Sequence, residues 1–254
     1  MRRRDFLGVL GSAAAAWPLA ADAQQRGRLP TIGYLGAATL SVTSEWVAAF
    51  VNRLRELGWI DGRTVTIEYR WAEGRKDRYM EIATEFARLK VDVIVTSGTP
   101  AVVAAKQATS IIPIVFAAAG DPVGNGLVAS LAQPGGNVTG QSLENSDLAG
   151  KLVELLREVV PDLHRLAILI NLGNPVAGPI VREVQAAART IDLEVVTLDI
   201  RRAEDIAPAF EAFKGSMDAL YILNDPLVNT NRIRINTLAL AARLPTIYAQ
   251  SDYV

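Results

Sequence analysis

Residues 91–106 read VDVIVTSGTPAVVAAK, and residues 217–232 read MDALYILNDPLVNTNR. Each stretch begins with an acidic residue at its second position, continues as an apolar run, and ends that run in a small polar turn that contains proline. A short apolar run of this kind is typical of a strand that is covered on both faces. A proline just after the turn favours the first turn of a helix. The same strand–turn–helix unit is therefore expected twice in this chain.

The segments around these two stretches also correspond. VTIEYRWAE from residue 65 corresponds to VVTLDIRRAE from residue 195, and IPIVFAA from residue 112 corresponds to LPTIYAQ from residue 244. Together with the opening pair, these segments make three matched units in one order. Matched units in one order predict an internal duplication, and hence two lobes of the same design.

Short apolar runs alternate with amphipathic stretches from Pro30 onward, which is the pattern of an α/β fold with parallel sheets and helices on both faces. We expect two Rossmann-like lobes, covering residues 28–141 and 142–254. The expected strands cover residues 31–36, 65–71, 91–97, 112–119, 165–171, 194–200, 218–223 and 245–249. The expected helices cover residues 44–59, 77–90, 100–109, 148–160, 174–191, 203–215 and 226–244.

Composition excludes several classes of function. Half of the 254 residues are apolar and 21% are charged, so the chain can form a substantial core. The net charge of −1 provides no basic excess for a nucleic-acid partner. The chain contains no cysteine and one histidine, His164, so disulfides, thiolate metal sites and multi-histidine metal sites are all excluded.

The N-terminus has the features of an export signal. MRRRDFLGVLGSAAAAWPLAADAQQ combines a basic start, a short apolar stretch and a small-x-small site that ends at Ala23. Residues 3–7, RRDFL, resemble the twin-arginine signal. We expect residues 1–23 to be a signal peptide, and the mature protein to be soluble outside the cytoplasm, in the periplasm.

Two lobes imply a cleft, and the expected strands end in turns that would line it. In open parallel sheets, ligands bind beyond the carboxyl ends of the strands. Four of these turns contain a proline preceded by a possible helix N-cap, and such helix starts bind anions through their free N–H groups. The four expected N-caps are Thr99, Asp121, Asn174 and Asp225. Each of these residues can also be explained by helix capping alone, without any role in ligand binding.

The sequence also resembles a known family. RELGWIDGRTVTIEYRWAEG, SGTPAVVAAKQAT, IPIVFAAAGDPVGNGLV and QPGGNVTGQS are similar to segments of the extracytoplasmic solute-binding proteins of ABC transporters, in the subgroup related to tryptophan and other aromatic amino-acid receptors. The resemblance runs from about Leu29 to the end of the chain and is denser in the first lobe. It implies the type I periplasmic binding protein fold, whose two lobes close on a ligand.

By this resemblance, the loops after the strands contact the ligand, which would be an amino acid or a related carboxylate. N–H groups near Gly98 and Thr99 suit a carboxylate, Asp121 or Asp225 suits an ammonium group, and Tyr248 could stack on an apolar side chain. The implied partners are the small solute and the permease subunits of the transporter, with no cofactor. The residues carried over are Gly36, Ala37, Ser97, Gly98, Thr99, Pro100, Asp121, Asn171, Asn174, Asn224, Asp225 and Tyr248.

The chain departs from the family pattern at its C-terminus. It stops at Val254, just after an expected strand and turn, whereas the relatives continue through further strands and helices. We therefore expect the second lobe to be incomplete.

Two other classes of function remain open. Residues 124–129, GNGLVA, fit a dinucleotide-binding pattern with Glu144 at a suitable distance, which would indicate an exported Rossmann-type enzyme. Against this, the glycines follow the fourth strand and not the first. The fold also serves ligand-sensing repressors, but no helix-turn-helix precedes Pro30 in this chain.

Overall fold

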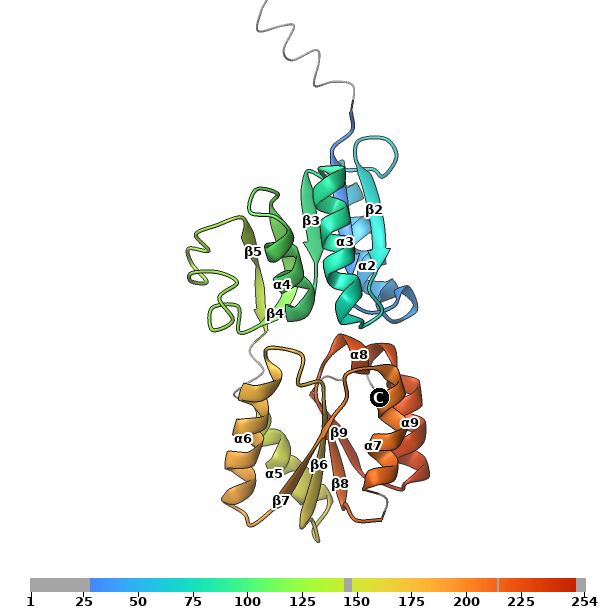
Figure 1. Ribbon diagram of the computed structural model, residues 1–254, viewed down its shortest axis with the longest axis vertical. Coiled ribbons are helices and arrows are strands. Elements are labelled where there is room, and N and C mark those ends of the chain that lie inside the picture. Colours follow the sequence, from blue (N-terminus) through green and yellow to red (C-terminus); the bar gives the residue numbers. More distant parts are fainter. Residues whose placement is uncertain (1–27, 144–147, 214, 250–254) are drawn as a thin grey trace, which may run out of the picture.

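The computed structural model describes residues 28–143, 148–213 and 215–249. Figure 1 shows two α/β lobes stacked along the long axis of the molecule, each built around its own sheet. We name residues 28–143 the N-terminal lobe and residues 148–249 the C-terminal lobe. The expected signal peptide, residues 1–23, lies outside the described residues.

The N-terminal lobe contains a five-stranded sheet in the order β2-β1-β3-β4-β5, with every neighbouring pair parallel. Its strands are β1 (Thr31–Gly36), β2 (Thr66–Trp71), β3 (Val93–Thr96), β4 (Ile114–Gly120) and β5 (Val138–Leu143). Its helices are α2 (Leu40–Glu56), α3 (Lys76–Leu89) and α4 (Thr99–Ala108).

The C-terminal lobe contains a four-stranded parallel sheet in the order β7-β6-β8-β9. Its strands are β6 (Arg165–Ile170), β7 (Glu194–Asp199), β8 (Ala219–Ile222) and β9 (Thr246–Tyr248). Its helices are α5 (Ala149–Val159), α6 (Ala177–Arg189), the short 3-10 helix η2 (Ala203–Asp205), α7 (Ile206–Ala212), α8 (Pro226–Thr230) and α9 (Arg232–Ala241).

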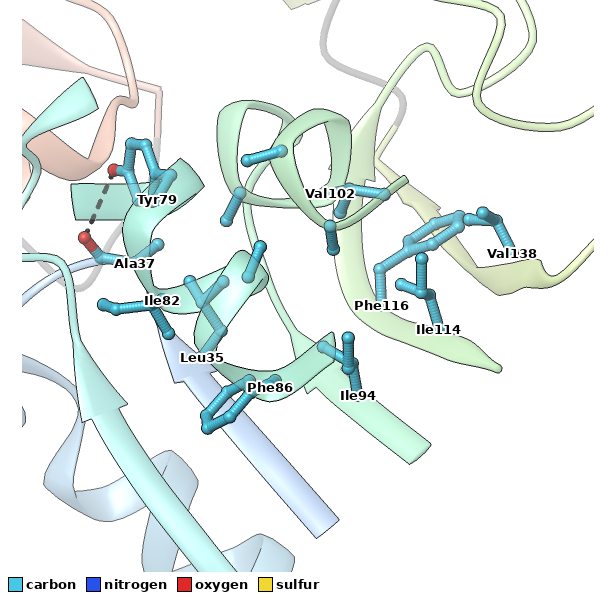
Figure 2. Packing of buried hydrophobic residues seen from close by; sticks show 14 of the residues in the cluster. Leu35, Ala37, Tyr79, Ile82, Phe86, Ile94, Val102, Ile114, Phe116 and Val138 are labelled. Atoms are coloured by element: carbon cyan, nitrogen blue, oxygen red, sulfur yellow. Dashed lines mark hydrogen bonds between the residues drawn. The ribbon is translucent and has the colours of Figure 1, made fainter. Parts of the chain in front are cut away.

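Both sheets are covered on both faces, as the α/β pattern predicts. In strand β1, Leu35 packs in the cluster formed with α3 and α4, whereas Ile32 packs in the cluster that includes Phe50 of α2. Figure 2 shows Leu35, Phe86 and Phe116 among the buried side chains of the first cluster. Strand β6 alternates in the same way, because successive side chains of a strand point to opposite faces.

The two sheets confirm the duplication expected from the sequence. The order β2-β1-β3-β4 in one lobe matches β7-β6-β8-β9 in the other, and each sequence-matched segment occupies the equivalent strand. The acidic residues that open the two stretches quoted first, Asp92 and Asp218, also act alike. The Asp92 carboxylate accepts the N–H of Thr31 at 2.7 Å, and the Asp218 carboxylate accepts the N–H of Arg165 at 2.7 Å. Each carboxylate therefore holds the start of the neighbouring first strand.

Replacing these carboxylates is expected to cost stability in proportion to the hydrogen bonds each one makes. Asp218 also accepts the N–H of His164 at 2.8 Å, so Asp218→Ala loses two backbone bonds where Asp92→Ala loses one. At about 1 kcal/mol for each bond, Asp218→Ala should lower the free energy of unfolding more than Asp92→Ala. Urea denaturation followed by circular dichroism measures both, with Asp162→Ala as a neighbouring control. An equal decrease in the free energy of unfolding in all three variants would show that these hydrogen bonds do not stabilise the strand starts.

The main error of the sequence prediction is that it does not include strand β5, Val138–Leu143, among the expected strands. The strand runs to Leu143, past the boundary expected after residue 141. Its sequence, VTGQSL, contains glycine and polar residues that disfavour strands. Tertiary contacts override this preference: Gly140 lies so close to Phe116 that an added methyl group would come within 2.0 Å of the Phe116 carbonyl oxygen. Asn137 anchors the strand start by donating to the Ile112 carbonyl at 2.8 Å.

The helix expected over residues 226–244 is divided into α8 and α9 at Asn231. The Asn231 side chain donates to the Leu227 carbonyl oxygen at 2.8 Å. Asparagine side chains that bond nearby backbone groups compete with helical hydrogen bonds, which explains the break. In the part of the chain that the structure describes, no helix has the length and apolarity needed to span a membrane.

Candidate functional site

The two lobes meet at the carboxyl ends of their strands, and glycines of the N-terminal lobe make the contact. A methyl group added to Gly74 would lie 2.6 Å from the Leu227 Cα atom, and one added to Gly120 would lie 3.0 Å from Val176 Cγ1. One added to Gly98 would lie 3.3 Å from the Pro226 ring. Gly74 and Gly98 have φ values of +74° and +83°, which residues other than glycine rarely adopt. The lobes therefore approach through backbone and small aliphatic groups.

A cavity of about 290 Å³, which we name the main cavity, lies beside this contact. Both lobes contribute to it, through the end of strand β4 and the loops that follow β1, β3, β6 and β8. This is the position expected for a ligand site at the ends of parallel strands. The volume is close to the lower end of the range for small-molecule sites, which begins at about 300 Å³, so it suits a solute of amino-acid size.

Apolar and aromatic side chains form most of the main cavity's wall. Trp46 and Phe50 lie one helical turn apart on α2, and Tyr34 of β1 packs between Phe50 and Trp71, with ring centroids 5.7 and 5.6 Å away. Burial raises the pKa of Tyr34, and Tyr69 beside it adds to the rise, so the Tyr34 hydroxyl stays protonated. The remaining apolar lining comes from Ala37, Ala38, Val95, Ala117, Ala118, Ala119, Leu143, Val176 and Pro226.

The N-terminus of helix α4 opens on the main cavity. Ser97, Gly98 and Thr99 line it there, and the N-cap residue, Gly98, has no side chain with which to cap the helix. The loop is rigidly held, because the Gly98 N–H donates to Ala118 at 2.7 Å and the Gly120 N–H donates to the Thr99 hydroxyl at 3.1 Å. The Ala101 and Val102 N–H groups donate to the Gly98 carbonyl oxygen and Pro100 has no N–H, so the helix dipole and the donors of Thr99 are what favour an anion here.

Asp225 lies buried at the start of α8, where it acts as the N-cap. Its carboxylate accepts the N–H of Leu227 at 2.7 Å and the side-chain amide of Asn174 at 2.9 Å, while the Asn171 amide lies 3.4 Å away. Burial raises the pKa of the Asp225 carboxyl, and the hydrogen bonds from Asn174 and Leu227 oppose that rise. The carboxylate therefore fixes the loop conformation of the C-terminal lobe.

A second cavity of about 230 Å³, the side cavity, contains Asp225 and is also lined by both lobes. Tyr79 of α3 lines it and donates its hydroxyl to the Ala37 carbonyl oxygen at 3.2 Å, as the dashed line in Figure 2 shows. Burial raises the pKa of Tyr79, and the nearby Asp225 charge adds to it. Tyr79 therefore ties α3 to the loop after β1, which also lines the main cavity.

A third cavity, the mouth cavity, adjoins the main cavity at Trp46 and Asn229, which line both. It is polar and has one charge of each sign, Glu45 on the N-terminal lobe and Arg232 on the C-terminal lobe. Among the described residues, charged groups thus line the adjoining cavity and not the main cavity.

The structure brings half of the twelve predicted site residues into one cavity. Pro100, Asn171 and Asp225 line the side cavity instead. Gly36, Asp121 and Tyr248 line neither: Gly36 packs against Trp71, Asp121 accepts the Gly124 N–H in a turn, and Tyr248 bonds to Asn236. The six in the main cavity are Ala37, Ser97, Gly98, Thr99, Asn174 and Asn224.

Of the four expected N-caps, only Asp225 is confirmed. Thr99 is wrong because α4 begins at Thr99 itself, and Asn174 is wrong because α6 begins at Ala177. Asp121 is wrong because it begins a series of turns and not a helix. At Thr99 the helix starts one residue earlier than expected, whereas after Asp121 and Asn174 the proline stabilises a turn and not a helix start.

The glycines of the possible dinucleotide motif lie in the same turns, so no helix starts at residues 124–129. The Lys106 side chain instead binds the carbonyl oxygens of Gly126 and Leu127. Glu144 lies outside the described residues. Within the described ranges, no group of three or more metal-ligating side chains is placed to hold a metal ion.

The sequence prediction missed the aromatic wall. Trp46 and Phe50 have the spacing of a buried helix face, which favoured a core position for both. The structure leaves Trp46 49% exposed at the cavity. Helix α2 begins directly after the loop that follows β1, so its first turns lie at the cleft. This position of the helix in the sequence was the signal that could have placed Trp46 at the cavity.

The sequence pattern of the ABC transporter substrate-binding proteins matches residues 42–254. A tyrosine-binding protein from Clostridioides difficile is 31% identical over 173 residues, which are 68% of this chain and 50% of that protein. The chain thus matches half the length of this curated relative.

Two solved structures are similar to both lobes together. A conserved domain protein from Vibrio cholerae is 27% identical with a TM-score of 0.80, and an ABC domain from Streptococcus pneumonia in complex with L-Trp is 25% identical with a TM-score of 0.78. Each similarity covers 89% of this chain and 76% of the other.

Proposed function

Because the chain belongs to the ABC transporter substrate-binding protein family, we propose that it is the extracytoplasmic receptor of an importer. The chain has the type I periplasmic binding protein fold, and its relatives are solute-binding proteins and not enzymes. The proposed ligand is a small solute with a carboxylate group and an apolar body, an amino acid or a related carboxylate, bound in the main cavity.

The observation that carries this proposal is the position and lining of the main cavity. It lies between the lobes, and both lobes supply residues to it: Thr99 and Trp46 from one, Asn174 and Asn224 from the other. A solute there contacts both lobes at once, so binding favours the form in which they are close together. A transporter that recognises this form would receive only the loaded receptor.

The chemistry of the wall indicates how the solute would lie. At the start of α4, Ser97 and Thr99 supply hydroxyl and N–H donors for a carboxylate, whereas Pro100 has no N–H and the Gly98 N–H donates to the Ala118 carbonyl oxygen. The rings of Tyr34, Trp46 and Phe50 provide an apolar surface for the rest of the molecule. The tyrosine-binding and L-Trp-bound relatives support a solute of this size and kind.

A ligand screen tests the proposal directly. The purified chain is titrated with amino acids, small carboxylates, sugars and nicotinamide cofactors, first by thermal shift and then by calorimetry. We expect one class of apolar carboxylate to raise the melting temperature, since a ligand that binds only the folded state stabilises it. A shift with NAD and no carboxylate would contradict the receptor function, as would the absence of any shift in a chain that melts cooperatively.

Removal of the Trp46 side chain is expected to weaken binding of the solute about tenfold. Trp46 lines the cavity and is 49% exposed, so Trp46→Ala removes a wall of the site without opening a buried core. The matched control is Trp59→Ala, since Trp59 is 44% exposed and lies outside the three cavities. Calorimetric titration of both variants measures the difference. An equal effect of the two substitutions on affinity would exclude Trp46 from the site.

A further inference from the structure

The mouth cavity is large enough to hold part of a solute. Its volume is about 290 Å³, the same as that of the main cavity. Trp46 and Asn229 line both cavities, so a solute that lies against these two side chains can reach from one cavity into the other. The main cavity alone suits a solute of amino-acid size, and the two cavities together suit a longer one.

Glu45 and Arg232 line the mouth cavity from opposite lobes. Glu45 precedes Trp46 on α2, and Arg232 is the first residue of α9, close after the helix α8 that Figure 1 shows where the lobes meet. In the part of the chain that the structure describes, neither side chain forms an ion pair, either with the other or with a third residue. Both charges can therefore bind groups of a solute that contacts the two lobes at once.

The two charges require complementary groups on that solute. A carboxylate such as that of Glu45 accepts charge-assisted hydrogen bonds from an ammonium group, and the guanidinium of Arg232 donates them to a carbonyl or carboxylate oxygen. Ser41 and Ser44 add hydroxyl groups to the same cavity. The end of the solute that lies in the mouth cavity should therefore carry an ammonium group and an oxygen acceptor close to each other.

A dipeptide has this arrangement of groups. Its C-terminal residue carries a carboxylate and a side chain, the two groups proposed for the main cavity, and its N-terminal residue adds an ammonium group and the peptide carbonyl oxygen. We propose that the chain binds short apolar peptides, of which dipeptides are the smallest, with Glu45 binding the N-terminal ammonium group and Arg232 binding the peptide carbonyl oxygen. This proposal rests on the proposed function and specifies its substrate class.

Three compounds with one side chain test the proposal: the free amino acid, its N-acetyl derivative and its glycyl dipeptide. The N-acetyl derivative has the peptide carbonyl group of the dipeptide but lacks the ammonium group. L-tyrosine, L-tryptophan and L-leucine provide three such series. Calorimetric titration of the chain at neutral pH should show, in the best-fitting series, that the dipeptide binds about fivefold more tightly than the N-acetyl derivative and more tightly still than the amino acid.

Two variants assign the expected gains to particular side chains. Glu45→Gln removes the negative charge and keeps the shape of the side chain, so it should weaken binding of the dipeptide about fivefold and leave the N-acetyl derivative unchanged. Arg232→Gln should weaken binding of both compounds about fivefold, since both have the carbonyl oxygen, and should leave the free amino acid unchanged.

The matched control is Glu56→Gln, the same substitution at the other end of α2. Glu56 pairs with Arg53 at the surface and lines none of the three cavities. This variant should bind all three compounds as the parent chain does.

The possible outcomes separate this proposal from the proposed function. A dipeptide that binds no more tightly than its amino acid or its N-acetyl derivative overturns the peptide specificity and leaves the receptor function in place. The same holds if Glu45→Gln weakens the dipeptide and the N-acetyl derivative equally, or if Arg232→Gln changes the binding of neither. If none of these compounds binds, and no other small carboxylate does, both proposals are overturned.

Discussion

Replacement of Gly74 by alanine is expected to weaken solute binding about 100-fold. The added methyl group would lie 2.6 Å from the Leu227 Cα atom and 2.8 Å from its backbone nitrogen. These atoms belong to the N-terminus of α8, which Asp225 holds in place, so they cannot rotate aside as a side-chain end could. The lobes must instead separate, and a solute in the main cavity loses contacts with one of them.

A matched control separates this effect from backbone strain. Gly62 has a φ value of +76°, almost the same as the +74° of Gly74, but an added methyl group there meets no atom within 4 Å. Gly62→Ala therefore carries the same backbone cost, about 1 kcal/mol, without touching the other lobe. Calorimetric titration of both variants with the tightest-binding compound of the screen makes the comparison. Comparable affinities in the two variants would show that the glycine contact is absent from the bound form.

Asp225→Ala is expected to lower the free energy of unfolding by about 3 kcal/mol. The substitution removes the N-cap of α8 and leaves the buried Asn174 amide without its acceptor. The penalty for a buried donor without a partner adds to the loss of the cap. Urea denaturation followed by circular dichroism measures the change.

Asp205→Ala serves as the comparison, because Asp205 also accepts two backbone N–H groups, those of Arg201 and Arg202, but does so at the surface. Its loss should be clearly smaller, since water can satisfy the freed groups. If the two variants unfold at the same urea concentration, burial of the Asp225 network contributes nothing beyond an ordinary cap.

Much of the fold could be predicted because the hydrophobic pattern and the tertiary structure agree. The apolar runs at residues 91–97 and 218–223 are buried strands, and the repeated order of segments gives the repeated order of strands. Strand β5 could not be predicted, because its pairing with β4 depends on the contact between Gly140 and Phe116 and not on local preference. The break at Asn231 likewise depends on a single side-chain hydrogen bond.

The candidate site was predictable as a set of loops but not as a set of contacts. The rule that ligands bind at strand ends located Ser97, Asn174 and Asn224 in the main cavity. It could not separate the two faces of the sheet ends, so it grouped Asp225 with residues of the main cavity although Asp225 borders the side cavity. The spacing of Trp46 indicates which helix face it occupies, but not whether protein or solute covers it.

The glycine contacts between the lobes have a consequence for the lifetime of the complex. Gly74, Gly98 and Gly120 touch the C-terminal lobe by van der Waals contact, and each such atom pair contributes only about 0.1–0.2 kcal/mol. These contacts alone are a weak restraint, so we expect the lobes to separate on the microsecond-to-millisecond timescale of domain motions. The residence time of the solute would then depend on how many contacts it makes with both lobes. A compound that touches only one lobe should dissociate quickly, however well it fits.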